Sequence, residues 1–137
     1  MTEIKLLKIQ LYYLFFFIIS SISCQIIKDI YLGQPIKGTM ELDESHEYFK
    51  LTIPPNIQNQ VLVFTTKQES ESNLPENDDT LFSDTDFYVS KINKYPSSRL
   101  SSEWYSQRYG ADIVTVPSGS VQGGDIFYVG MYCQFKC

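Results

Sequence analysis

The sequence predicts an all-β protein, a single antiparallel β-sandwich of the jelly-roll-like type. Tyr and Phe are abundant, with 10 and 9 residues in a chain of 137, and large aromatic and β-branched residues favour strands over helices. Short apolar runs recur between Gly, Pro and Ser residues, as in strands separated by turns. After the N-terminal region, no segment has the 3.6-residue apolar period of an amphipathic helix.

Residues 1–24 have the layout of a secretory signal peptide, which we expect to form a helix ahead of the domain. Lys5 and Lys8 precede an apolar run over 11–19, and small serines follow before Cys24. The run is shorter than the roughly 20 apolar residues of a membrane span. Cleavage after Cys24 is favoured, because it leaves an even number of cysteines in the secreted chain. The predicted location is therefore outside the cell or on its surface.

Three alternatives stay open for this region: cleavage before Cys24, acylation of Cys24 as in a bacterial lipoprotein, and an uncleaved signal anchor. The remainder, residues 25–137, has the size of one domain. It ends at Cys137 in an apolar, strand-like context. Either the last strand is short, or the domain lacks its last strand and the chain is part of a longer product.

The charge of the domain limits its partners. Residues 25–137 contain nine basic and fifteen acidic side chains, a net charge of −6. Nucleic-acid binding needs clustered Lys and Arg against phosphates, so nucleic acid is not an expected partner. We expect an extracellular protein or polysaccharide. Contact with a membrane is expected only through a signal anchor or a missing C-terminal region.

The first predicted strands lie at 36–42 and 47–53, joined by a hairpin turn at the polar segment 43–46. Phe49, Leu51 and Ile53 alternate with polar or amphipathic residues, the period of a half-buried strand. The Pro-Pro pair at 54–55 ends this strand, because proline cannot donate to a sheet.

Four more strands are predicted further along the chain, at 61–65, 86–91, 112–116 and 125–133. The run at 61–65 is apolar up to its final threonine and is expected to be buried on both faces. An acidic loop at 68–80 precedes the next strand. The serine-rich segment 95–110 is a long connection, and its Trp104 is expected to cover the end of the core.

Cys133 and Cys137 are the predicted disulfide. In a straight strand four residues span roughly 13 Å, whereas a disulfide needs Cα atoms about 4.4–6.8 Å apart. A bridge between them therefore requires a sharp turn at 134–136. The alternative is that each cysteine has another partner, one of them in a missing C-terminal region.

Acidic residues suggest a cation site. Asp84 and Asp86 follow the carboxylates of the 68–80 loop, and calcium takes six or more oxygen ligands. The spacing matches no EF-hand loop. The alternative is a solvated acidic surface, and no other cofactor is expected.

A second candidate site is the group of aromatic and arginine residues in the serine-rich connection. These residues suggest either a ligand-contact patch or a plain linker with a buried tryptophan. They are Tyr95, Arg99, Trp104, Tyr105, Arg108 and Tyr109.

Catalysis is not expected. His46 is the only histidine, and it lies in a polar segment that suggests an exposed turn. The sequence has no Gly-x-Ser-x-Gly elbow, no phosphate-binding loop and no His-Glu-x-x-His motif.

Three segments carry a family resemblance: the Tyr-Phe strand at 47–53, the segment 83–90 (SDTDFYVS) and the segment 124–132 (GDIFYVGMY). Together they resemble the pre-peptidase C-terminal type of β-sandwich, and they are also similar to modules of protist surface proteins. The resemblance implies a non-catalytic extracellular module with a binding or structural role. Its alternative is an accessory domain of a secreted hydrolase that binds carbohydrate, matrix or calcium. Asp84 and Asp86 match the second motif. Members of the family have a further strand after the position of 132–133. A domain that lacks this strand would have an unpaired sheet edge.

Overall fold

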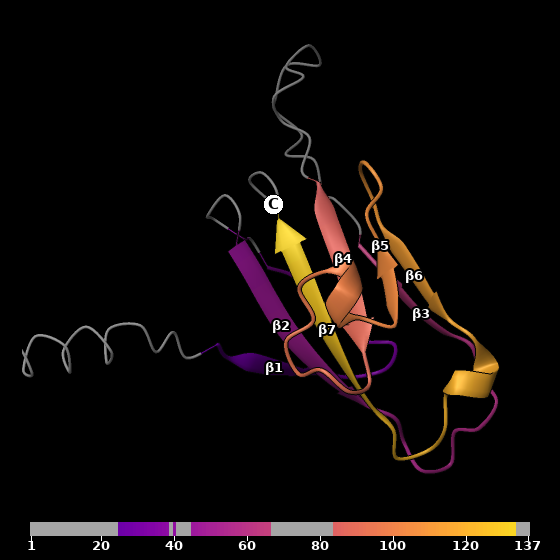
Figure 1. Ribbon diagram of the computed structural model, residues 1–137. Coiled ribbons are helices and arrows are strands. Elements are labelled where there is room, and N and C mark those ends of the chain that lie inside the picture. Colours follow the sequence, from indigo (N-terminus) through magenta and orange to yellow (C-terminus); the bar gives the residue numbers. More distant parts are fainter. Residues whose placement is uncertain (1–24, 39, 41–44, 67–83, 134–137) are drawn as a thin grey trace, which may run out of the picture.

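The computed structural model describes residues 25–38, 40, 45–66 and 84–133 (Figure 1). This part of the chain is built from short strands and two 3-10 turns, with no α-helix. The strands are β1 (Ile27–Ile30), β2 (Ser45–Thr52), β3 (Leu62–Thr65), β4 (Thr85–Ser90), β5 (Trp104–Ser106), β6 (Ile113–Val116) and β7 (Ile126–Cys133). The 3-10 turns are η2 (Arg99–Ser101) and η3 (Ser118–Ser120). The all-β prediction is confirmed.

The strands form a five-stranded sheet in the order β1-β2-β7-β4-β5 and a two-stranded sheet of β3 and β6. All pairs are antiparallel except β1 with β2, which is parallel. The last strand, β7, is central: it pairs with β2 from Ile126 to Cys133 and with β4 from Tyr128 to Cys133. Both edges of β7 are therefore hydrogen-bonded to neighbouring strands, and the lack of a further strand after 132–133 stays a prediction.

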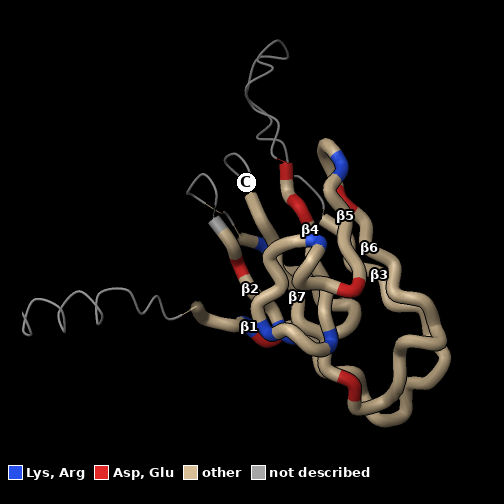
Figure 2. Tube along the Cα trace, in the orientation of Figure 1, with Lys and Arg blue, Asp and Glu red and all other residues tan. Residues whose placement is uncertain are grey.

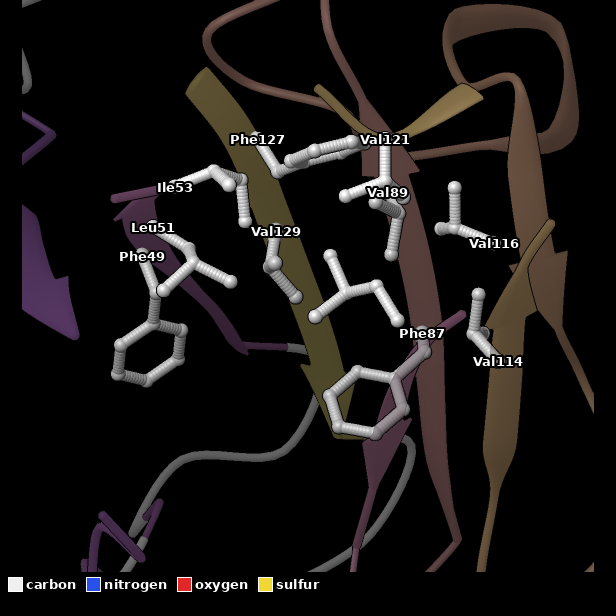
Figure 3. Close-up of a cluster of buried hydrophobic side chains, with 11 residues drawn as sticks. Phe49, Leu51, Ile53, Phe87, Val89, Val114, Val116, Val121, Phe127 and Val129 are labelled. Atoms are coloured by element: carbon white, nitrogen blue, oxygen red, sulfur yellow. The ribbon is translucent and has the colours of Figure 1, made fainter. Parts of the chain in front are cut away.

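The core lies between the two sheets and confirms the two-residue periodicity (Figure 3). Phe49 of β2 lies opposite Val129 of β7, and Val129 lies opposite Val89 of β4, so one row of apolar side chains crosses three strands. Val114 and Val116 of β6 close the core from the second sheet. Because alternate residues of a strand point to opposite faces, every second side chain of β2, β4 and β7 faces this core, and residues of the other face, such as Tyr48 and Tyr88, are buried as well.

The two-stranded sheet is covered on one face only. Leu62 is buried in the core, whereas Val63 is 51% exposed and Ile113 is 60% exposed. The prediction that 61–65 is buried on both faces is therefore wrong. The apolar run at 61–65 reflects the preference of its residue types for strands and not burial on both faces. The outer face of β3 and β6 has no covering layer among the described residues.

A loop after β4 covers the other face of the five-stranded sheet. A Cβ atom added at Gly130 would lie 1.8 Å from the Pro96 carbonyl oxygen, so the loop backbone rests directly on β7. Beside this contact the Tyr48 and Tyr95 rings pack edge to face with centroids 5.2 Å apart. This covering loop leads into η2, which lies in front of the sheet (Figure 1).

Two strands were not predicted. β1 pairs with β2 and is held by ion pairs of Lys28 with Glu47 (2.7 Å) and of Asp29 with Lys50 (2.9 Å). By contrast, the predicted strand 36–42 is not a strand in its described residues 36–38 and 40. β5 lies inside the segment predicted as a connection. The strands predicted at 61–65, 86–91, 112–116 and 125–133 are confirmed with ends displaced by one residue or less.

The N-terminal prediction lies outside the described residues, since it concerns residues 1–24. Within the part that the structure describes, no helix is long and apolar enough to cross a membrane.

Candidate functional site

An open hollow of about 410 Å³ lies beside β5, at the end of the sandwich where β5 connects to β6. Residues from η2, β5, the β5–β6 loop and the start of β6 line it. They are Arg99, Tyr105, Ser106, Gln107, Arg108 and Ile113. Figure 2 shows a basic segment on the loop above β5 and β6. The structure thus brings Arg99, Tyr105 and Arg108 of the predicted patch to one place.

The two arginines are the only arginines of the chain. The Arg99 guanidinium carbon lies 4.8 Å from the centroid of the Tyr105 ring, a cation–π contact. Tyr105 remains 42% exposed. In the described part of the chain neither Arg99 nor Arg108 forms a salt bridge.

The lysines on the sheets behave differently. Lys28, Lys50 and Lys91 each form an ion pair with a carboxylate, at 2.7, 2.9 and 2.7 Å. The charge of these lysines is therefore matched locally, whereas the guanidinium groups of the hollow have no carboxylate partner among the described residues.

A buried carboxylate organises the floor of the hollow. Asp112 is 0% exposed, and its Oδ1 atom accepts hydrogen bonds from the Ser106 hydroxyl and from the Arg108 backbone N–H, the latter at 3.1 Å. Its backbone N–H donates to the Thr66 hydroxyl at 2.8 Å. Asp112 therefore ties β5, the β5–β6 loop and the end of β3 together. A buried polar group of this kind is costly unless its hydrogen bonds are made. Oδ1 makes two and thereby fixes the loop geometry, whereas Oδ2 has no hydrogen-bond partner among the described residues.

Asp84 and Asp86, the predicted cation ligands, lie at the same end of the sandwich. Partial burial raises the pKa of Asp84; a hydrogen bond from the Gly110 backbone opposes this, and the charges of Asp86 and Asp112 add to it. Gly110 has φ +92°, in the left-handed region that suits glycine. Asp84 thus stabilises the turn of the β5–β6 loop.

Asp86 supports the same loop through its side chain. The Asp86 Oδ2 atom accepts from the Tyr88 hydroxyl at 3.1 Å and from the Gln107 amide at 3.3 Å. Gln107 also donates to the Tyr88 oxygen at 2.9 Å. Burial, together with the neighbouring Asp86 charge, raises the pKa of Tyr88 to about 12. The phenol therefore stays protonated and continues to donate at neutral pH.

These contacts bear on the calcium hypothesis. Among the described residues no group of three or more His, Cys, Asp or Glu side chains is placed to hold a metal ion. A calcium site with Asp84 or Asp86 would need carboxylates of the acidic loop at 68–80, which lies outside the described residues. The calcium site stays a prediction.

Serines of the connection hold Arg99 in place. The Ser101 hydroxyl accepts from the backbone N–H groups of Ser97 and Ser98, each at 2.9 Å. At the end of β4 the Ser90 hydroxyl accepts from the backbone N–H groups of Ile92 and Asn93. Serine-rich composition therefore provides the hydrogen bonds of a compact turn here, and η2 presents Arg99 to the hollow.

The remaining aromatic residues of the connection divide between core and loop. Trp104 is half-buried and packs against the core, with its ring centroid 5.9 Å from that of Phe127. The prediction that Trp104 covers the core is confirmed. Tyr95 packs on Tyr48 instead of entering the hollow.

Sequence reasoning missed Ser106, Gln107, Asp112 and Ile113. The one available signal was the alternation of Trp104, Tyr105 and Ser106. Trp104 packs on the core and Ser106 is buried, while Tyr105 points outward.

Two further predicted positions are placed in strands. Cys133 is fully buried at the end of β7 and is not a free thiol. Cys137 lies outside the described residues, so the pairing of Cys133 with Cys137 stays a prediction. His46 is exposed, as predicted, but it lies in β2 and not in a turn. Its ring lies 4.7 Å from the Tyr132 ring.

Comparison with known proteins found no matching family model, no matching curated protein and no matching solved structure.

Proposed function

We propose that this protein is a non-catalytic β-sandwich module, secreted or displayed on the cell surface, that binds an extracellular ligand in the hollow beside β5. The observation that carries the proposal is the convergence of the chain's two arginines, Arg99 and Arg108, on one hollow with an exposed tyrosine. The signal-peptide layout of residues 1–24 supports the location. The resemblance to the pre-peptidase C-terminal type of module supports a role without catalysis.

We favour a polysaccharide over a folded protein as the ligand. Small-ligand sites are concave and commonly enclose roughly 300–1,000 Å³, and the hollow measures about 410 Å³. A stable protein interface needs about 800 Å² per partner, far more surface than these six lining residues offer. One or two sugar units at the end or side of a polymer match the size of the hollow.

A glycan array tests the proposal. The full chain, expressed through a secretory host so that any processing occurs, is labelled and applied to neutral, carboxylated and sulfated saccharides. We expect retention on at least one saccharide class and its loss in the double variant Arg99→Ala/Arg108→Ala. Retention on no class, or full retention by the double variant, contradicts the proposal.

A further inference from the structure

The charge of the residues that line the hollow is opposite in sign to the net charge of the protein. The protein carries a net charge of −5, yet its two arginines line one hollow, and neither is neutralised by a carboxylate of the described residues. Arginine is the side chain best suited to bind carboxylate, sulfate or phosphate groups, because its planar guanidinium offers paired donors. The hollow therefore favours an anionic group.

The acidic remainder of the protein restricts the size of that anion. At physiological salt the Debye length is about 8 Å. Among the described lining residues the two guanidinium groups are the only charged groups, and the Asp112 carboxylate beneath them is buried, while an extended polyanion would also meet the exposed acidic surface. A ligand with one negative charge at the point of contact gains the attraction and avoids most of the repulsion.

The other lining residues indicate what carries the charge. Tyr105 offers a ring that is already stacked with Arg99 on one side and is 42% exposed, and such a ring pairs an apolar body with a polar tip. The Gln107 amide and the start of β6 at Ile113 complete a lining of mixed polarity. A sugar ring, with hydroxyl groups at its edge and C–H bonds on its faces, has the same mixture.

We propose that the hollow binds a sugar unit bearing a single carboxylate or sulfate group, with Arg99 and Arg108 contacting the anion and Tyr105 the sugar ring. This inference rests on the proposed function and narrows it to an acidic saccharide. The Asp112 hydrogen bonds to Ser106 and to the Arg108 backbone hold the floor in place before the ligand arrives. Such prior ordering lowers the entropic cost of binding.

Titration calorimetry of the full secreted chain tests the inference with matched saccharide pairs. Galacturonate is compared with galactose, and galactose 6-sulfate is likewise compared with galactose. We expect the acidic member of at least one pair to bind about 10-fold or more tightly than its neutral partner, since hydrogen bonds to charged groups are the stronger ones. The better acidic ligand identifies carboxylate or sulfate as the recognised anion.

Variants separate the hollow from general charge. Arg108→Ala removes a side chain without a salt-bridge partner in the described structure, so its melting temperature should match that of the parent while acidic-sugar affinity falls about 10-fold. Lys94→Ala removes the same charge from an exposed residue that does not line the hollow, and it should leave affinity unchanged.

Each outcome has a separate meaning. Equal binding of acidic and neutral sugars, or equal losses in the Arg108 and Lys94 variants, overturns the acidic-sugar inference but leaves the binding module standing. Absence of binding to every saccharide overturns both. Binding only to a long polyanion such as heparin, lost between 0.05 and about 0.15 M salt, also overturns the inference, because it reports counterion release and not a single-anion site.

Discussion

Gly130→Ala probes the contact that holds the covering loop on the sheet. The added Cβ would lie 1.8 Å from the Pro96 carbonyl oxygen, 3.0 Å from its carbon and 3.3 Å from Cε1 of Tyr48. Ordinary contact begins at 3.4 Å, so the Pro96 carbonyl must withdraw by about 1.6 Å. Pro96 is among the fully buried side chains, and the neighbouring Tyr48–Tyr95 contact leaves the loop little room for this movement.

The expected cost follows from two opposing effects. Overpacking a well-packed site costs about 1–3 kcal/mol. Replacing glycine in a strand returns about 0.5–1 kcal/mol, because the unfolded chain loses conformational freedom. The net destabilisation should be about 1–2 kcal/mol, and for a domain of this size the melting temperature should fall by roughly 4–10 °C.

Urea unfolding followed by Trp104 fluorescence measures the effect, since Trp104 packs on the core close to this loop. Gly119→Ala is the matched control: a Cβ there meets no atom within 4 Å, so its stability should stay within about 0.5 kcal/mol of the parent. If Gly130→Ala proves as stable as Gly119→Ala, the loop does not rest on β7 as described.

Four other predictions concern charge, calcium, processing and a disulfide. Burial raises the pKa of Asp84 above its ordinary 3.8, so the charged carboxylate lowers the stability of the fold. Asp84→Asn should therefore be more stable than the parent at pH 7, and the difference in stability should close below pH 3.8. Thermal melts at several pH values measure this, and a difference that does not change with pH would contradict it. Millimolar calcium should raise the melting temperature and Asp86→Ala should abolish the rise; an unchanged parent melt means that the acidic loop is only a solvated surface. Exported protein should begin at Gln25 or one residue earlier; N-terminal sequencing that finds Met1 would refute this. Its non-reduced peptides should contain Cys133 joined to Cys137; mass spectrometry that finds two free thiols would refute the disulfide.

Local sequence patterns predict where most strands lie and, for β2, which face is buried. In β2 the alternation at Phe49 and Leu51 predicts the core side, and in β6 Val114 and Val116 lie on the buried side of a predicted strand. This information is local, because successive side chains of a strand point to opposite faces whatever the strand pairs with. Pro54 marked the end of β2 for an equally local reason, its missing N–H.

How these strands meet depends on contacts between segments that are distant in the chain. β1 has two charged residues, Lys28 and Asp29, between its isoleucines, and β5 is only three residues long. Neither forms an apolar, β-branched run like those of β3 and β6, and they are strands because β2 and β4 supply their hydrogen-bond partners. The central place of β7 and the contact of Gly130 with Pro96 likewise depend on pairing between distant segments. The same holds for the hollow. Short-range hydrogen bonds among serines shape η2, but Arg108 reaches the same hollow as Arg99 because the buried Asp112 ties the β5–β6 loop to β5 and to Thr66. The contact with Thr66 joins segments far apart in the chain, and no local pattern records it.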